Sequence, residues 1–356
     1  DWIDAAGLRC TGGDPEFRDR VPAEDATVVA RMRQAGAILL GKTNVMVDNP
    51  VYGRANNPYN LGYSTTGSSS GEAALIAAGG SPLGLGSDSG GSIRQPAHAC
   101  GVVGLKPTTG RVPLTGHFPF ICAMTDPRTV IGPLARFVED LALTLPILAG
   151  VDWKDPSVVP MSLADWRAVD LPGLRVATYT HHAGAEPTPE TAETCRKAAG
   201  LLSGLGARVE ETLPPRIEEA APLTRRYWQR AESASADEYV AGGEIQLTSL
   251  EMEQHLFEWD RFRRALVGFM EAFDVILTPA AEQPAAPHGA EGGWIPYTLP
   301  YSLTGWPCVV VRAGTSPEGM PIGVQVVARP WREDVALAVA HAIEGAFGGW
   351  QPPELD

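Results

Sequence analysis

The chain has 356 residues, of which 44% are hydrophobic and 20% are charged, a composition typical of a globular rather than a disordered protein. Its 28 lysines and arginines against 42 aspartates and glutamates give a net charge of −14, which argues against nucleic-acid binding because an acidic surface repels phosphates. No apolar run reaches the ~18 residues of a membrane span, and no signal peptide is visible in the sequence that begins at Asp1.

The five cysteines indicate neither a disulfide framework nor a zinc site. They are odd in number and scattered, and none belongs to a CxxC or CxxH pair. We expect a reducing, cytoplasmic location, and we expect neither a metal nor an organic cofactor. The five are Cys10, Cys100, Cys122, Cys195 and Cys308.

The first third of the chain predicts a helix, a short strand and a glycine-rich loop. Residues 25–35 place apolar side chains at helical spacing, with Asp25 as the candidate N-cap and Gly36 as the residue that ends the helix. The Ala-Ile-Leu-Leu run at 37–40 predicts a short buried strand. Residues 61–71 are rich in glycine and serine, but an apolar, helix-forming sequence follows them. They therefore predict a loop that feeds a buried helix rather than a linker.

Strands and helices alternate through the rest of the chain, which predicts an α/β fold with a largely parallel or mixed sheet. An extended run at 83–86 enters a second glycine-rich turn at 87–92. Thr188 and Pro189 are the residue types of an N-cap and a first helical position. There is no internal repeat and no clean linker, so we predict one domain over residues 1–356. Strands are predicted at 174–179, 208–211, 274–278, 308–311 and 323–327, and helices after Thr188, within 216–272 and over about 334–346.

A match to the phosphate-binding pattern GxxxxGK[ST] at 36–43 is rejected because its context is wrong. A phosphate-binding loop follows a strand and precedes a helix, and its amides point outward. Here a predicted helix comes first, and the interior of the match is apolar. We interpret the segment as a buried strand that ends in a turn.

A GxSxG match at 67–71 resembles the nucleophile elbow of α/β-hydrolases, with Ser69 as the nucleophile, and it is also rejected. An elbow requires a buried strand before it, and the Tyr-Ser-Thr-Thr sequence at 63–66 does not predict one. It also requires a downstream acid and histidine. The histidines lie in no catalytic sequence context; His255 and His341 fall in predicted helices, where a packed or solvated histidine is the ordinary interpretation.

Two serine–glycine turns separated by one buried helix remain as the candidate site. The first spans residues 68–71 and the second spans residues 88–94. Glycine pairs let successive N–H groups converge on a ligand, so such a turn ending in serine supplies both a nucleophile and an oxyanion hole. With no catalytic histidine, the base would belong to the serine–lysine class. The alternative is that Gly-Gly-Ser is only a tight turn that caps the next helix.

Residues 67–111, from Gly-Ser-Ser-Ser-Gly through Gly-Gly-Ser-Ile-Arg to Gly-Leu-Lys-Pro-Thr-Thr-Gly-Arg, closely resemble the signature of the amidase signature family. The resemblance spans nearly the whole chain, and its Gly-Gly-Ser-Ile-Arg core is highly specific. It implies a single large α/β domain whose mixed, mostly parallel sheet has helices on both faces, with a signature core at about 61–140. The other matching segments are 36–44, 57–58, 132–140, 303–305, 319–325 and Asp334.

The resemblance assigns roles to residues of both turns. Ser92 aligns with the acylated nucleophile, and Ser68 aligns with a serine that follows a cis peptide bond and relays protons. The implied oxyanion hole consists of the backbone amides of Ser89, Gly90, Gly91 and Ser92. The residues implied to support the site are Gly67, Ser69, Asp88 and Arg94.

The family's general base, a buried lysine whose pKa is lowered by burial, is absent from this chain. The resemblance places it immediately before Asp1, so we interpret the N-terminal segment that carries it as missing from the sequence. The alternative is a shortened homologue without the base. We favour the first interpretation because losing a strand and its helices would expose the core. Lys42 and Lys106 match other, structural positions of the family.

The chain departs from the family pattern in three places. The segment between Asn44 and Asn49 is a few residues shorter than usual, through either a deletion or an omitted loop. Thr66 replaces a glycine that usually precedes Gly67, which bears on the cis-peptide turn. Ser302 replaces a common asparagine, an effect that we expect to be local.

The resemblance implies hydrolysis of a C–N acyl bond in a small-molecule amide, ester or carbamate. The sequence at 303–331 looks most like bacterial aryl acylamidases and urethanases, which indicates an aryl or apolar substrate. No nucleic acid and no membrane is expected as a partner. An aromatic wall for that substrate, with burial in the core as the equal alternative, would be formed by Trp294, Tyr297, Tyr301 and Trp306.

Two other functions stay open. One is the amidase subunit of a glutamine-dependent amidotransferase, which would pass ammonia to a partner carrying tRNA and would show glutaminase activity that depends on that partner. The other is a catalytically dead scaffold, which is expected if the lysine is truly absent.

Overall fold

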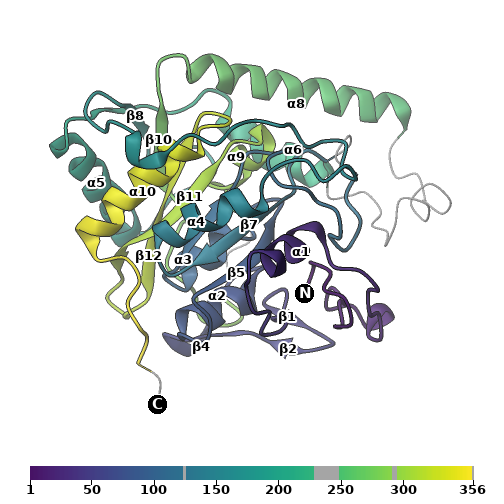
Figure 1. Cartoon of the computed structure of the whole chain (residues 1–356). Helices are drawn as coiled ribbons and strands as arrows, with labels where there is room; N and C mark the ends of the chain where they lie inside the picture. Colours follow the sequence, from purple (N-terminus) through teal and green to yellow (C-terminus); the bar gives the residue numbers. More distant parts are fainter. Residues whose placement is uncertain (123–125, 228–247, 291–294, 355–356) are drawn as a thin grey trace.

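An eight-stranded mixed sheet crosses the computed structural model, which describes residues 1–122, 126–227, 248–290 and 295–354 (Figure 1). The strands predicted in the second half of the chain are all present in this sheet. In the order in which they lie side by side, the strands are β5 (Leu83–Asp88), β7 (Val130–Ala135), β6 (Val103–Lys106), β11 (Cys308–Thr315), β12 (Pro321–Ala328), β10 (Val275–Pro279), β8 (Arg175–Thr178) and β9 (Arg208–Glu211).

Most neighbouring strands are antiparallel, so the mixed sheet is confirmed while its predicted mostly parallel character is wrong. Five of the seven pairings are antiparallel, and only β8 lies parallel to its neighbours, β10 and β9. Residues 316–320 join β11 to β12, and this connection is too short for a parallel crossover. The alternation of strands and helices along the chain predicted parallel pairing. It did not predict that β11 and β12 are joined directly, without a helix between them.

Nine α-helices are described around the sheet, and the predicted helical region at 216–272 is helical in the parts that the structure describes. They are α1 (Thr27–Gln34), α2 (Ser70–Ala77), α3 (Arg94–Ala99), α4 (Val138–Leu148), α5 (Pro189–Gly204), α6 (Ala220–Tyr227), α8 (Ser249–Phe269), α9 (Leu299–Thr304) and α10 (Glu333–Phe347). Two small sheets, β1 (Asp48–Asn49) with β2 (Gly53–Arg54) and β3 (Asn56–Asn57) with β4 (Asn60–Ser64), precede α2.

Helices cover both faces of the sheet, as the resemblance implied. Successive residues of a strand point to opposite faces. Val309 and Val311 of β11 pack in one apolar cluster with residues of α4, α5 and α10. Cys308 and Val310 pack in other clusters, with residues of α8 and α9 or of α2 and α3. The central strands are therefore buried on both faces, which explains why they are continuous apolar runs.

The buried strand predicted at 37–40 is absent, and this prediction was wrong. These residues are in no strand and are exposed; Ile38, for example, is 85% exposed. They line a cavity of about 930 Å³ that is open in the described part of the chain. The apolar pattern indicated a segment that favours burial, but burial also requires a partner that covers it.

The first predicted helix is confirmed as α1, but Asp25 does not cap it. Ala26 occupies the N-cap position, and the Asp25 carboxylate instead accepts a 2.7 Å hydrogen bond from the N–H of Ala6. Because α1 precedes residues 36–43 and the next helix begins only at Ser70, the phosphate-binding interpretation stays rejected. No helix within the described ranges is both long and apolar enough to cross a membrane.

Candidate active site

The two serine–glycine turns lie directly against each other. The first leads into α2, and the second connects β5 to α3. The N–H of Ser69 donates a 3.1 Å hydrogen bond to the carbonyl oxygen of Ser92. The structure thus brings the segments of Ser68 and Ser92 together, as the predicted relay and nucleophile require.

The first turn has an unusual backbone. The peptide bond between Gly67 and Ser68 is cis, as the resemblance implied. Thr66, which replaces the family's glycine, has a φ of 56°, in the left-handed region that glycine adopts readily and β-branched residues avoid. The carbonyl oxygen of Ser68 accepts a 2.9 Å hydrogen bond from the N–H of Met46, which holds the turn against the preceding loop.

The hydroxyl of Ser68 is buried and has no hydrogen-bond partner among the residues that the structure describes. The residue is 4% exposed and borders the same 930 Å³ cavity that residues 37–40 line. A buried hydroxyl without a partner costs about 1–3 kcal/mol. This arrangement suits a relay group whose second partner reaches it from the cavity.

The second turn presents four successive N–H groups, those of residues 89–92, that donate no hydrogen bond within the described part of the chain. Gly91 has a φ of 149°, and a Cβ atom built on it would lie 2.6 Å from Oγ1 of Thr298. Only glycine fits this position without moving its neighbour. The turn therefore places unpaired amides beside Ser92, which is the arrangement that an oxyanion hole requires.

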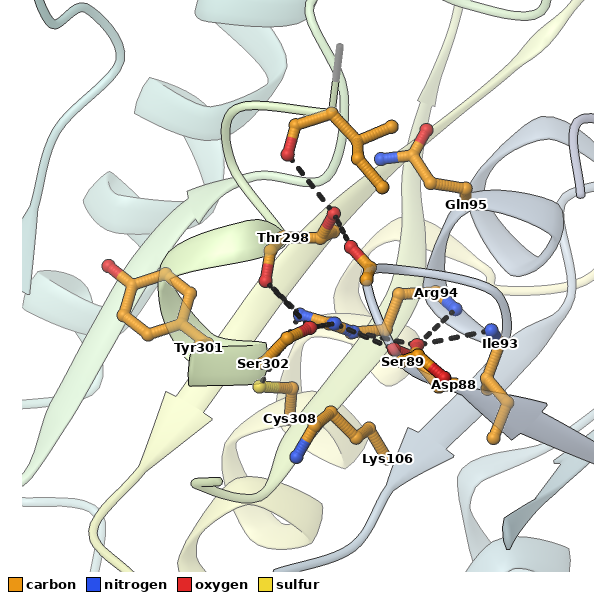
Figure 2. A network of polar contacts seen from close by, with 12 residues as sticks. Asp88, Ser89, Ile93, Arg94, Gln95, Lys106, Thr298, Tyr301, Ser302 and Cys308 are labelled. Carbon is orange, nitrogen blue, oxygen red and sulfur yellow. Dashed lines mark hydrogen bonds and ion pairs between the residues drawn. The ribbon is translucent and has the colours of Figure 1, made fainter. Parts of the chain in front are cut away.

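A buried ion pair lies behind the second turn (Figure 2). Arg94 donates from Nε to Oδ2 of Asp88 at 2.9 Å and from Nη2 to Oδ1 at 2.8 Å, and both side chains are fully buried. Oδ2 also accepts a 3.1 Å hydrogen bond from the N–H of Ile93. Burial alone would raise the pKa of Asp88, but the guanidinium of Arg94, together with the charge of Lys106 and the N–H of Ile93, holds this pKa below its ordinary value.

Arg94 also connects the second turn to α9 and β12. Its Nη1 donates to the carbonyl oxygen of Thr298 and to Oε1 of Gln325, both at 2.8 Å, and its Nη2 donates to Oγ of Ser302 at 2.6 Å. Ser302, which replaces the family's asparagine, thus accepts from the same guanidinium. Figure 2 shows Asp88, Thr298 and Ser302 around Arg94.

Neither nearby lysine is hydrogen-bonded to Ser68. Nζ of Lys106 is buried and donates to the carbonyl oxygens of Trp306 at 2.9 Å and Pro107 at 3.3 Å, and burial lowers its pKa to about 8. Nζ of Lys42 donates to the carbonyl oxygen of Ile3 at 2.6 Å. These contacts agree with the structural positions that the resemblance gave to both lysines.

The buried histidine nearest in sequence to the second turn serves the fold. Nδ1 of His98 accepts a 2.9 Å hydrogen bond from the N–H of Gly323, which leaves Nε2 to donate to the carbonyl oxygen of Gln283 at 3.0 Å. Burial lowers the pKa of this imidazole, so it stays neutral. Both ring nitrogens are occupied by backbone groups, and none is available to a serine.

The proposed aromatic wall is not a surface, and this prediction is corrected. Tyr297 and Tyr301 are completely buried and Trp306 is 3% exposed, all within one apolar cluster with residues of α8. The hydroxyls of Tyr179 and Tyr301 are 2.9 Å apart, and that of Tyr297 donates to the carbonyl oxygen of Thr180. These side chains are core because their polar ends find partners inside it. Trp294 lies outside the described residues.

A second cavity, of about 400 Å³, borders Gly67 of the first turn and Gln95 of α3. Its charged lining, in the described part of the chain, consists of two carboxylates, Glu186 and Glu282. Neither glutamate was predicted from the sequence as a site residue. Two isolated glutamates in unrelated segments carry no pattern, and only folding brings them to one cavity.

Thr298 was also missed by the sequence analysis. It precedes a short helix with a proline in its first turn, so an N-cap would be the natural interpretation. Its hydroxyl does not cap α9 and instead donates a 2.6 Å hydrogen bond to the carbonyl oxygen of Gly90.

Comparisons with known proteins identify the family of the chain. The family model described as Amidase matches residues 1–256 and 246–337. The A subunit of glutamyl-tRNA(Gln) amidotransferase from Exiguobacterium sibiricum is 33% identical over 410 residues, which cover 100% of this chain and 84% of that protein.

Two solved structures share the fold over 99% of this chain. The structure of 6-aminohexanoate cyclic dimer hydrolase complexed with substrate has a TM-score of 0.84 and 28% identity, with 85% of that chain covered. The A subunit of glutamyl-tRNA(Gln) amidotransferase from Thermotoga maritima has a TM-score of 0.83 and 27% identity, with 84% of that chain covered. None of these three proteins is an aryl acylamidase or a urethanase, so they do not support that finer placement.

Proposed function

Because the chain belongs to the amidase family, we propose that it hydrolyses a C–N acyl bond through an acyl-enzyme on Ser92. One observation carries the proposal. A cis turn with a buried, unpaired Ser68 hydroxyl lies against a turn whose N–H groups at 89–92 are unbonded in the described structure. The first has the features of a proton relay, and the second has those of an oxyanion hole.

The reaction follows from these positions. Oγ of Ser92 attacks the acyl carbon and its proton passes to Ser68, while the carbonyl oxygen becomes an oxyanion held by the N–H groups of 89–92. The C–N bond breaks as the amine leaves with a proton relayed through Ser68. Water then attacks the acyl-enzyme and releases the acid and Ser92. A carbamate would instead yield an alcohol and carbon dioxide.

Ser68 needs a base, and we assign this role to the lysine that the resemblance places immediately before Asp1. The cavity beside Ser68 supports the assignment because it offers space and apolar walls for such a side chain. Burial among them would lower the pKa of the lysine, as it does for Lys106. Intact mass and N-terminal sequencing of the purified protein test the assignment, since residues ending in lysine are expected before Asp1.

A second candidate function is the glutaminase subunit of an amidotransferase. Two of the similar proteins are A subunits of such an enzyme, which favours this function over aryl acylamidase or urethanase activity. We infer from its position beside Gly67 and Gln95 that the 400 Å³ cavity receives the substrate, and its lining favours a different one. Its described lining contains two carboxylates and no lysine or arginine, so it offers no counter-charge to the α-carboxylate of free glutamine. A neutral or amine-bearing amide fits this lining better.

The decisive experiment is labelling with a fluorophosphonate followed by peptide mapping, together with hydrolysis assays. Modification of Ser92 is expected, and Ser92→Ala should remove it. Release of 4-nitroaniline from 4-nitroacetanilide would support amide hydrolysis, and ammonia release from glutamine only with added partner subunits would support the second candidate. A Ser92→Ala variant that hydrolyses these substrates at the wild-type rate would overturn the mechanism.

A further inference from the structure

We propose that Thr298 is a positioning residue that aims the N–H of Gly91 at the oxyanion, an inference that rests on the proposed function. Its hydroxyl donates a 2.6 Å hydrogen bond to the carbonyl oxygen of Gly90, inside the second turn (Figure 2). Thr298 is completely buried, and no other donor to this carbonyl is present among the described residues.

The planarity of the peptide unit converts this contact into a constraint on the next amide. The carbonyl of Gly90 and the N–H of Gly91 belong to one trans peptide plane, so they point in opposite directions. Holding the Gly90 oxygen toward Thr298 therefore directs the Gly91 N–H away from Thr298. A glycine pair has little intrinsic preference for one orientation of the peptide between its members, so an external hydrogen bond is needed to fix it.

Thr298 is itself held rigidly by the network behind the turn. Its carbonyl oxygen accepts from Nη1 of Arg94 at 2.8 Å, and its own N–H donates to the carbonyl oxygen of Ile295 at 3.2 Å. A Cβ at Gly91 would lie 2.6 Å from its Oγ1, so the threonine also packs against the turn that it bonds. Because the hydroxyl leaves α9 uncapped, its position is better explained by the turn than by the helix.

Thr298→Val keeps the shape of the side chain and removes the hydroxyl, whereas Thr298→Ser keeps the hydroxyl. Loss of a whole oxyanion donor lowers kcat about 100- to 1,000-fold. Thr298→Val leaves the N–H of Gly91 in place but no longer fixes its orientation. We therefore expect this variant to lower kcat about 10- to 100-fold with KM nearly unchanged. Thr298→Ser should restore most of kcat.

The test uses the full chain with 4-nitrophenyl butyrate as substrate and a fluorophosphonate as probe of Ser92. Thr304→Val is the matched control, because Thr304 is the last residue of α9 and its hydroxyl donates, among the described residues, only to the carbonyl oxygen of Tyr301, at 3.3 Å. Thermal unfolding of each variant verifies folding. A fall in kcat and labelling rate for Thr298→Val alone supports the proposal. Equal rates in Thr298→Val and wild type, or equal losses in all three variants, would overturn it.

Crystal structures of the variants separate this proposal from the proposed function. If wild-type Ser92 does not react with the probe, the proposed function fails, but the orientation of the Gly90–Gly91 peptide is still measurable. A rotated or disordered peptide in Thr298→Val, with the wild-type orientation in Thr298→Ser, supports the positioning role. An unchanged peptide in Thr298→Val contradicts it.

Discussion

The two turns of the candidate site differ in whether their polar groups find hydrogen-bond and ion-pair partners among the described residues. Around the second turn, the charges of Asp88 and Arg94 are paired and fully buried, and Arg94 is also hydrogen-bonded to α9 with its N-cap residue and to β12. Around the first turn, the Ser68 hydroxyl has no described partner, and apolar residues at 37–40 face an open cavity. In the proposed mechanism, oxyanion binding therefore relies on a turn whose support is complete among the described residues, whereas proton transfer relies on a hydroxyl whose partner is not among them.

The largest effect is expected at the nucleophile. Ser92→Ala should lower turnover by at least about 1,000-fold, because the remaining site can only bind and polarise the substrate. Its unfolding midpoint should match that of the wild type, since Ser92 contributes no side-chain hydrogen bond among those described. Steady-state kinetics and thermal unfolding check this together. A variant that unfolds early would assign Ser92 to the fold instead.

The paired charges behind the second turn should show the next largest effect. Asp88→Asn leaves a buried guanidinium uncompensated and should lower the free energy of unfolding by about 3–5 kcal/mol, measured in urea. Asp260→Asn is the control, because it breaks an exposed pair with Arg264 and should leave the unfolding midpoint unchanged. Similar midpoints for both variants would show that the buried pair is unimportant.

The same pair predicts a pH dependence. The pKa of Asp88 is below its ordinary value in the folded protein. Its contribution to stability is therefore fully present above the unfolded pKa of ~3.9 and is lost as the pH falls through the folded pKa. Acid unfolding of the wild type should be steeper in this range than that of Asp88→Asn, and curves of equal slope would contradict the assignment.

Lys106 allows a test of whether a described lysine is the general base of the proposed mechanism. Its pKa falls from 10.5 to about 8 on folding because it is buried, so the unfolded chain binds the extra proton between these values and stability rises with pH there. The rise should be on the order of 3 kcal/mol and should vanish in Lys106→Met. Turnover should persist in this variant. Complete loss of turnover with an intact fold would make Lys106 the base.

The smallest effect is expected on the open wall of the cavity. Ile38→Ser should change the free energy of unfolding of the 356-residue chain by less than about 0.5 kcal/mol, because Ile38 is 85% exposed. Ile76→Ala in α2 is the buried counterpart and should cost about 2–5 kcal/mol. A cost of several kcal/mol for Ile38→Ser would show that another segment covers this wall.

The second turn could be identified as a candidate site from the sequence because its residues are contiguous. Gly-Gly-Ser followed by Ile-Arg places amides, hydroxyl and guanidinium within one short stretch, and the structure contains the cis bond before Ser68 that the resemblance implied. Strands such as β10, β11 and β12 were predictable because burial on both faces requires uninterrupted apolar residues. The direction of the strands was not predictable, because it depends on the connections between them, and the hydrophobic pattern does not reveal these connections.

The parts that sequence reasoning missed depend on contacts between distant residues. Thr298 bonds Gly90 across 208 positions, and nothing local distinguishes it from an ordinary helix cap. The tyrosines at 297 and 301 were open to either interpretation, because the same aromatic residue types line pockets and fill cores. The prediction of a strand at 37–40 was wrong for the opposite reason. The local sequence favours burial, but burial also requires another segment that packs against it.

The reach of Arg94 also has a consequence for the order of events during synthesis. Its partners at 298, 302 and 325 emerge from the ribosome more than 200 residues after it does. Closing such long loops is entropically costly, and the contacts form only when both ends are available. A nascent chain that has completed the first half of the sheet therefore holds Ser92 without its scaffold. The proposed reactivity of Ser92 would therefore begin only in the finished chain, and pulse-labelling of stalled chains would measure its onset.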